Sequence, residues 1–312
     1  MKRQNNRIAL FFALPTSILL LFFLILPVLC NVIISTLEIG NDPEQWFNSS
    51  VSLDLDNYVA AVMQDGFISA VKNSTIYTIL TTLCVTVIGL LAAVCLREPF
   101  KGRGIVITLI MLSWSIPSYV VGIFFGYVFQ QDNSLVNFLL FDILNLDTIS
   151  TWLGAEWNHN QLGQFIAPRW LDNKYSVLTV AIPAIWHYWP YSMLLFLAGL
   201  NSIQNDIDKA ATMDGADRID KLFYITIPIL RPVLVAVLIQ NFIINIYSFN
   251  IVVMMFGTGT IIPSKDADMI IPYIFRTAFQ YWNLGIGAAL STMLMLIVGI
   301  SVLYYYKNLN GN

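Results

Sequence analysis

PVLVAVLIQNFIINIYSFNIVVMMFGTGTIIPS, residues 232–264, contains no Asp, Glu, Lys or Arg. A helix needs about 20 residues to cross the hydrocarbon core of a bilayer, and this stretch is longer than that. Inside lipid every backbone amide and carbonyl needs a partner within the protein, which favours a helix over an isolated strand. The stretch therefore predicts a membrane-spanning helix.

Five further stretches of similar length also lack charged residues, and the whole chain is 57% hydrophobic but only 11% charged. Soluble domains carry about a quarter charged residues. We therefore predict an all-α integral membrane protein with six transmembrane helices. One lies within residues 1–37, and the other five lie at about 72–96, 104–131, 175–204, 232–257 and 277–306, together forming a core at 72–306.

The distribution of Lys and Arg predicts the orientation, because cytoplasmic loops are enriched in these residues. With the N-terminus inside, eleven of the 16 basic residues lie on the cytoplasmic side. We therefore expect both termini in the cytoplasm. The segments 38–71 and 132–174 are then extracytoplasmic, and 205–231 is a cytoplasmic loop between helices 4 and 5.

The sequence offers no pattern for catalysis or for a bound cofactor. It has no G-x-x-x-x-G-K-[ST] phosphate loop, so we expect any ATP and Mg to be bound by a partner. Its three cysteines fall in apolar stretches and its only histidines are His159 and His187, which indicates no metal site. We expect His187 to be a hydrogen-bonded polar residue within helix 4, with a role in a transport path as the alternative. No basic, aromatic-interleaved patch suggests nucleic acid.

The loop 205–231 has a helical pattern of its own. Asn205 or Asp206 can cap a first short helix, whose apolar face is Ile207, Ala210 and Ala211. Gly215 is expected to end that helix in the left-handed conformation.

A second short helix is expected after this glycine. Asp217 can cap it, and Pro228 and Pro232 are expected to stop it before helix 5. Its apolar face would consist of Ala216, Ile219, Leu222 and Phe223. An exposed apolar face indicates a protein partner; the alternative is that the chain's own helix ends cover it.

Helix 5 also carries uncharged polar residues on one face. Asn241, Asn245 and Ser248 follow the i, i+4, i+7 spacing, and Asn250 lies close by. Amides are costly in lipid unless paired, so this face should point into a bundle or a wet cavity. Helix 4 contains WHYWPY, residues 186–191. Amides and aromatic rings together suit a sugar, although hydrogen bonds between helices are an equally simple explanation of the amides.

One stretch in particular resembles a known family. KAATMDGADRIDKLFYITIPILRP, residues 209–232, resembles the cytoplasmic signature E-A-A-x-x-x-G, followed by a spaced I-x-L-P, of permease subunits in binding-protein-dependent ABC importers. The matching residues are Ala210, Ala211, Asp214, Gly215, Ala216, Ile225 and Pro228. SWSIPSYVVGIFFGYVFQ and YIFRTAFQYWNLGIGAALS are similar to the family's third and last helices. The resemblance runs from about residue 54 to the C-terminus and favours the carbohydrate branch, as the first permease of a heteromeric pair like those for maltose or glycerol-phosphate.

The resemblance implies a transport subunit of the bacterial inner membrane rather than an enzyme. The implied partners are a second permease, a cytoplasmic ABC ATPase dimer, an extracytoplasmic solute-binding protein and a carbohydrate substrate. The residues implied in coupling to the ATPase are Lys209, Ala210, Ala211, Asp214, Gly215, Ala216, Leu222, Phe223 and Pro228. By resemblance Tyr188, Tyr191, Asn245 and Ser248 line the substrate path, and we add Asn241 and Asn250 from the polar residues of helix 5.

Two positions depart from the family pattern. Lys209 stands where the family has Glu, and Gln204 stands where it usually has Pro. The first reverses a charge that, by resemblance, pairs with a basic residue of the ATPase. Exposed ion pairs contribute little, so docking through the alanine face is compatible with this change.

A stand-alone secondary transporter or channel is the alternative from another functional class. Ion-coupled carriers usually place ionisable groups in the membrane, yet the six predicted helices contain no Asp or Glu. Purification discriminates between the two, because a permease subunit should be recovered together with an ATPase and a sister subunit.

Overall fold

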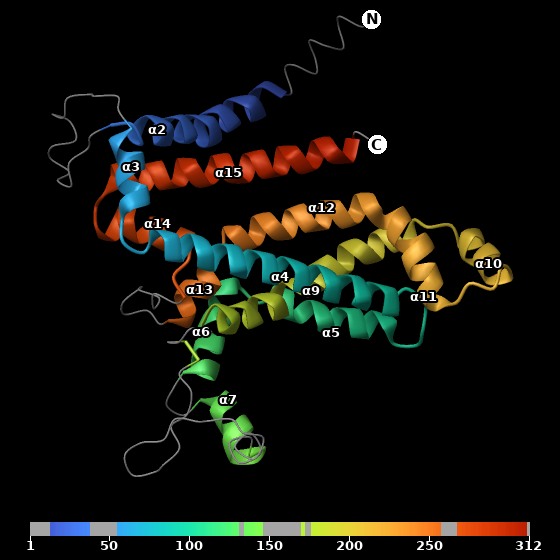
Figure 1. Ribbon diagram of the computed structural model, residues 1–312. Helices are drawn as coiled ribbons and strands as arrows, with labels where there is room; N and C mark the ends of the chain where they lie inside the picture. Colours follow the sequence, from blue (N-terminus) through green and yellow to red (C-terminus); the bar gives the residue numbers. More distant parts are fainter. Residues whose placement is uncertain are drawn as a thin grey trace, which may run out of the picture. The chain divides into compact units, whose positions relative to one another are not determined.

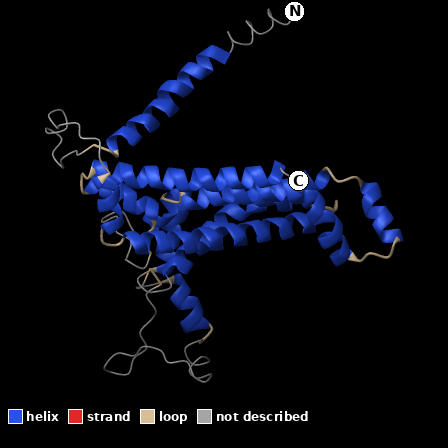
Figure 2. Ribbon diagram, turned by 45° about the horizontal axis from the view of Figure 1, so that its top comes forward, coloured by secondary structure: helices blue, strands red, loops and turns tan. Residues whose placement is uncertain are grey.

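The computed structural model describes residues 13–37, 55–130, 134–145, 170–171, 176–256 and 267–310. Within these ranges the regular elements are helices (Figure 2). The chain forms two compact units. Unit 1 consists of Met1–Ile68 and Tyr273–Tyr304, and unit 2 consists of Ser69–Pro272 and Tyr305–Asn312.

Unit 1 contains the first and last long helices of the chain. Asn31 Nδ2 donates a hydrogen bond of 3.0 Å to Thr292 Oγ1 and thereby joins these two helices. Asn57 Nδ2 donates to the Leu37 carbonyl at 2.8 Å. The elements of this unit are the π-helix η1 (Leu21–Ile25), α2 (Leu26–Ile34), α3 (Asp56–Met63), the π-helix η5 (Arg276–Gln280) and α15 (Leu284–Asn310, which runs past the end of the unit).

Unit 2 contains a bundle of long helices that run side by side (Figure 1). α5 and α12 both pack against α9. α10 lies beyond one end of this bundle, and α6 and α13 lie at the other end. The elements are α4 (Phe67–Cys95), α5 (Arg103–Ser115), α6 (Ser118–Phe129), α7 (Leu135–Asn137), η3 (Phe138–Ile143), α9 (Ser176–Asn201), α10 (Asn205–Met213), α11 (Arg218–Asp220), η4 (Lys221–Thr226), α12 (Ile227–Ile246) and α13 (Asn250–Met255), with α14 (Ile270–Phe275) crossing into unit 1.

Several helices are long and apolar enough to span a membrane. Among the described residues four continuous helices qualify, and α5 with α6 forms a fifth candidate that is bent by 85°. α9 contains no charged residue but is not among these candidates. The four continuous spans are Ala13–Ile34, Phe67–Cys95, Lys221–Ile246 and Leu284–Tyr304.

Three of the predicted helices differ in the structure from the expected continuous segments. The segment 104–131 is interrupted at Ile116, which has an extended backbone, and at Pro117. The segment 232–257 is interrupted at Tyr247–Phe249, between α12 and α13. The segment 277–306 is interrupted at Tyr281–Asn283, between η5 and α15. The sequence lacks charges across these breaks, so the charge pattern alone does not reveal them.

The prediction that Pro228 and Pro232 stop a helix is wrong. The helical backbone runs from Arg218 to Ile246 without interruption. Pro228 lies just after the π-helical turn and Pro232 lies inside α12, so neither proline ends the helix. The π-helical turn Lys221–Thr226 directly before α12 shifts the hydrogen-bond register at this point, as local adjustments near helix prolines often do.

Two apolar clusters form the core of unit 2. The first joins Tyr77 of α4 to Val180 of α9 and Val252 of α13. The second joins Phe196 of α9 to Leu230 of α12. Along α4 and α9 these clusters lie on either side of a buried polar region, which is described below.

The short helices α6 and α13 approach each other unusually closely. Gly122 and Gly126 form a G-x-x-x-G motif on α6, a spacing that lets two helix backbones pack together in membranes. A Cβ atom added at Gly122 would lie 2.7 Å from Met254 Cβ and 2.8 Å from the Ile251 carbonyl oxygen. One added at Gly126 would lie 2.8 Å from the Met255 carbonyl oxygen. Only glycine fits at these two positions.

We predict that Gly122→Ala lowers the stability of the folded chain by about 1–3 kcal/mol, the range for overpacking a tight contact. The neighbouring atoms belong to the backbone and a Cβ of α13, so they cannot move aside cheaply. The measurement is the midpoint of thermal unfolding in detergent. Gly299→Ala in α15 is the control, because no atom lies within 4 Å of its added Cβ. Equal midpoints for the two variants would contradict the prediction.

Candidate functional site

The first candidate site is the coupling segment, defined here as α10, α11 and η4, which together join α9 to α12. At the end of α10, Gly215 has a φ of +87°. Its N–H donates to the Thr212 carbonyl at 3.1 Å, and the Ala216 N–H donates to the Ala211 carbonyl at 3.0 Å. These two bonds constitute a Schellman motif. The predicted left-handed conformation of Gly215 is therefore confirmed.

The start of the second helix is fixed by Asp217, as predicted. Its Oδ1 accepts hydrogen bonds from the backbone N–H of Ile219 at 2.8 Å and of Asp220 at 2.7 Å. In return the Asp217 N–H donates to Asp220 Oδ2 at 3.3 Å. This reciprocal arrangement satisfies donors that a helix start leaves unpaired.

The predicted cap of α10 is wrong. Asn205 is the first residue of the helix, and the preceding Gln204 has an extended backbone and makes no capping bond through its side chain. Most family members have proline at position 204, and a proline would fix φ near the value that Gln204 has here. Gln204 therefore adopts the backbone conformation that the proline would favour.

The coupling segment has two arms: α10, and the second helix formed by α11 and η4. A side-chain hydrogen bond connects them. Lys221 Nζ donates to Thr212 Oγ1 at 2.7 Å. Together with the Schellman motif and the Asp217 cap, this bond fixes the direction in which the chain leaves α10 and enters the second helix.

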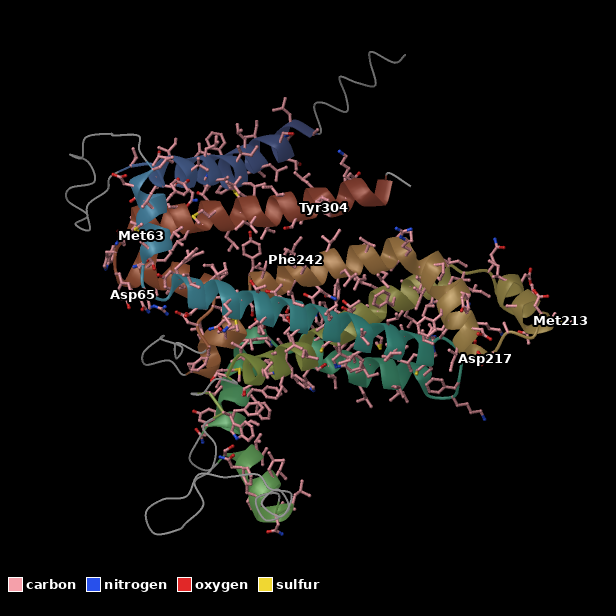
Figure 3. The ribbon with its side chains drawn as sticks, in the orientation of Figure 1. Met63, Asp65, Met213, Asp217, Phe242 and Tyr304 are labelled. Carbon is pink, nitrogen blue, oxygen red and sulfur yellow. The ribbon has the colours of Figure 1, made fainter. Side chains whose placement is uncertain are left out.

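Apolar side chains of the coupling segment are exposed on its surface. Met213 is 87% exposed, and Ile219 and Phe223 are 65% and 59% exposed. Figure 3 shows Met213 and Asp217 on the two arms. The alternative that the chain's own helix ends cover the predicted apolar face therefore fails for Ile219 and Phe223. Of the other implied coupling residues, Ala210, Asp214, Gly215 and Pro228 are exposed, Ala216 and Leu222 are half-buried, Ala211 is buried, and the side chain of Lys209 lies outside the described part.

The second candidate site is the polar layer, defined here as Thr82 and Thr86 of α4, Ser192 of α9, and Asn241 and Asn245 of α12. All five side chains are buried. Asn241 Nδ2 donates to Thr86 Oγ1 and to Ser192 Oγ, both at 3.0 Å. Asn245 Nδ2 donates to the Asn241 carbonyl at 2.8 Å and more weakly to Thr82 Oγ1 at 3.4 Å. The layer thus links three helices by hydrogen bonds.

One acceptor in this layer is left over. Asn245 Oδ1 is buried and has no hydrogen-bond partner among the described residues, and the same holds for Thr78 Oγ1 on α4. Thr78 precedes Thr82 by one helical turn, so both hydroxyl groups lie on the same face of α4. A buried acceptor without a partner is costly, so Asn245 is the member of the layer with spare hydrogen-bonding capacity.

Ser248 lies beyond the polar layer, at the break that follows α12. Its Oγ is 3.0 Å from the hydroxyl of Tyr77 on α4, and both side chains are buried. The predicted shared face of Asn241, Asn245 and Ser248 therefore points towards α4, where it is enclosed in this conformation.

The remaining implied path residues lie in different surroundings. Tyr191 of α9 stacks on Trp114 of α5, with ring centroids 5.1 Å apart and planes 18° apart. Tyr188 is half-buried against the first apolar cluster. Asn250 is exposed, and its Nδ2 donates to Ser118 Oγ at 3.2 Å. The six residues thus do not form one continuous surface in this conformation.

Comparison with known families identifies the chain. The family described as "Binding-protein-dependent transport system inner membrane component" matches residues 85–310, which include α9, the coupling segment, the polar layer residue Thr86 and α12. The chain belongs to this family. Members of this family are transport components, not enzymes, and the chain is accordingly a multi-pass inner-membrane component of a binding-protein-dependent transport system.

Curated relatives in this transport family match along nearly the whole chain. The inner membrane ABC transporter permease protein YcjO of Escherichia coli is 30% identical over 99% of this chain and 97% of its own length. The trehalose/maltose transport system permease protein MalF of Thermococcus litoralis is 27% identical over 98% of this chain and 95% of its own length.

Solved structures share the fold of this inner-membrane component. A chain of a bacterial alginate ABC transporter, solved in complex with an alginate pentasaccharide-bound periplasmic protein, superposes with a TM-score of 0.76. The match covers 98% of this chain and 95% of the other chain at 20% identity. A further structure of an alginate-importing ABC transporter gives a TM-score of 0.75 at 22% identity.

Sequence reasoning missed the α4 and α9 sides of the polar layer. Thr78, Thr82 and Thr86 recur every four residues within a charge-free stretch, and this spacing places them on one helix face. That regularity was the available signal. Ser192 has no polar neighbour at helical spacing that repeats along α9, so it gave no comparable signal.

We predict that Asn241→Ala destabilises this transport component more than Asn245→Ala does. Hydrogen bonds between membrane helices contribute about 0.6 kcal/mol each, and Asn241 exchanges such bonds with both Thr86 and Ser192. Asn245 has only one long bond to another helix. The expected loss is therefore about 1–2 kcal/mol for Asn241→Ala and less than about 1 kcal/mol for Asn245→Ala. Thermal unfolding in detergent measures both, and the reverse order would rule out this assignment of bonds.

Proposed function

We propose that the chain is the permease subunit of an ATP-driven importer and forms half of a translocation path for a sugar or oligosaccharide. A second permease forms the other half, an extracytoplasmic binding protein delivers the substrate, and a cytoplasmic ABC ATPase dimer supplies the energy. Membership of the binding-protein-dependent family supports this role. The trehalose/maltose relative, which matches over nearly its full length, supports a saccharide substrate.

The observation that carries the proposal is the geometry of the coupling segment. Its apolar residues Met213, Ile219 and Phe223 are exposed, and α10 lies beyond one end of the bundle (Figure 1). An exposed apolar surface suits a protein partner. Its two arms are held by backbone and capping bonds, so a force applied to one arm is transmitted to the other with little deformation. The coupling residues proposed above, from Lys209 to Pro228, belong to or directly follow this segment.

The proposal includes six transmembrane helices with both termini in the cytoplasm. Four continuous spans and the bent pair α5–α6 account for five of them. α9 is the sixth, because it is 26 residues long, contains no charged residue and leads directly into the coupling segment. The orientation follows from the excess of Lys and Arg on the proposed cytoplasmic side.

The proposed substrate path runs along α9 and α12. Tyr188, Tyr191 and Asn250 keep part of their surface accessible, whereas Asn241, Asn245 and Ser248 contact substrate only when α4 separates from α12. Asn245 is the best placed of these three buried residues. Its Oδ1 has no hydrogen-bond partner among the described residues and could accept a hydrogen bond from a sugar hydroxyl. None of these six side chains carries a charge, which favours a neutral saccharide over an acidic one.

The decisive experiment is purification of the tagged chain after expression with its neighbouring transport genes, followed by reconstitution into vesicles. We expect a complex with a second permease and an ATPase, and saccharide uptake that requires ATP and the binding protein. Uptake of a neutral glucose trisaccharide should exceed that of a uronate trisaccharide. Transport by the chain alone, without ATP, would overturn the proposal in favour of a secondary carrier.

We predict that Gly215→Ala weakens association with the ATPase about five- to tenfold. A left-handed conformation costs an L-residue roughly 1–2 kcal/mol, and relief of that strain reorients the second arm. Gly102→Ala is a matched control, since Gly102 has a φ of +88° and, like Gly215, no atom within 4 Å of an added Cβ. Gly102 lies in the separate turn between α4 and α5. Affinity measured in detergent should fall only for Gly215→Ala; an equal fall in both variants would mean that general instability is the cause.

A further inference from the structure

The bend between α5 and α6 leaves the last carbonyls of α5 without their usual helical donors, and the Ser113 carbonyl is one of them. In a continuous α-helix the Ser113 carbonyl accepts from the N–H of residue 117. Residue 117 is proline and has no N–H, and Ile116 before it is extended, with φ −70° and ψ 131°. An unpaired carbonyl within a membrane span costs several kcal/mol, so another group has to replace the missing donor.

His187 of α9 supplies that donor. Its Nδ1 lies 2.8 Å from the Ser113 carbonyl oxygen, and its side chain is buried. A carbonyl oxygen can only accept a hydrogen bond, so the proton is on Nδ1. The neighbouring Leu112 carbonyl accepts from the Ser115 hydroxyl at 2.8 Å. The end of α5 thus pairs one carbonyl locally and one through a different helix.

A second contact attaches the same two helices at the same level. Trp114 follows Ser113 on α5 and stacks on Tyr191, which lies one turn after His187 on α9. Two consecutive residues at the end of α5 are therefore held by two residues of α9 that are one helical turn apart.

We propose that His187 is a positioning residue that holds the bend of the broken span. By pairing the carbonyl that Pro117 leaves free, it fixes the point at which α5 ends and the direction in which α6 departs. α6 in turn carries Gly122 and Gly126, which pack against α13. His187 acts through the backbone of α5 and makes no contact with substrate in this role.

The role of His187 also implies a mechanical connection between the coupling segment and the α5–α6 bend, and this connection rests on the proposed function. α9 leads into the coupling segment at one end and holds the α5–α6 bend through His187. Displacement of α9 by the ATPase would therefore reach the α6–α13 pair at the other end of the bundle. We expect His187→Leu to lower the amount of saccharide transported per ATP hydrolysed.

The test measures the bend itself, without substrate or ATP, so its outcome does not depend on the transport assay. Spin labels at positions 109 and 124 replace exposed residues on α5 and α6, in a full-length chain whose three native cysteines are replaced by alanine. The chain is placed in lipid nanodiscs and the distance distribution is recorded by pulsed electron resonance. We expect one narrow distribution for the native His187.

Three variants decide the result. His187→Leu should broaden and displace the distribution, because the donor is lost. His187→Asn should restore it, since the Asn amide nitrogen is bonded to Cγ as Nδ1 of histidine is. Ser202→Ala removes a hydrogen bond to the Gly199 carbonyl of α9, away from the bend, and should leave the distribution unchanged. An unchanged distribution in His187→Leu, or failure of His187→Asn to restore it, overturns the proposal.

A second measurement covers the case in which His187→Leu does not accumulate in the membrane. Accumulation should then be recovered by His187→Asn, and also by His187→Leu combined with Pro117→Ala, because alanine returns an N–H to position 117. Recovery by both supports the role of His187 as a substitute donor. If neither recovers accumulation, His187 contributes by packing alone and the proposal is wrong.

Discussion

The need to pair every backbone polar group inside the membrane governs the rest of this structure. Two of the breaks in its predicted membrane segments, at Ile116–Pro117 and at Tyr247–Phe249, each expose backbone groups that an intact helix would satisfy. At the first break the partners are side chains, the Ser115 hydroxyl and the His187 ring. At both breaks the following short helix is held in place by close packing of α6 on α13. Irregular backbone is tolerated at membrane depth only where protein surrounds it in this way.

The polar layer gives the bundle of unit 2 a defined register. Apolar side chains in lipid gain little from packing together, and polar contacts and close packing contribute much of the preference for one arrangement. Asn241 bonds to both α4 and α9, and a helical turn of slippage in α12 would break both bonds. The two apolar clusters on either side tolerate small shifts far better. We therefore assign register to the polar layer and bulk packing to the clusters.

The sequence predicted local structure correctly where a short pattern is compatible with only one backbone conformation. Gly215 was predictable because glycine at a helix end adopts the left-handed conformation at low cost, and Asp217 because aspartate caps the following amides. The break at Ile116–Pro117 was not predicted, and nothing local to it indicates that the Ser113 carbonyl is paired by His187, which is far away in the sequence. Pro232 was misread as a helix stop because tertiary packing and a π-helical turn accommodate it. Gly122 and Gly126 were visible as a motif, but nothing local to them indicated α13 as the partner.

The helical backbone is continuous from Arg218 to Ile246, but it changes direction, because α11 lies at an angle to α12 (Figure 1). A π-helical turn separates α11 from α12 and Pro232 lies inside α12; both features are common causes of helix kinks. From Pro232 to Asn245 the helix rises about 20 Å at about 1.5 Å per residue, so tilting this part by about 10° would shift Asn245 by about 3 Å. A rotation beneath the lipid that reached this part of α12 would therefore separate Asn245 from Thr82.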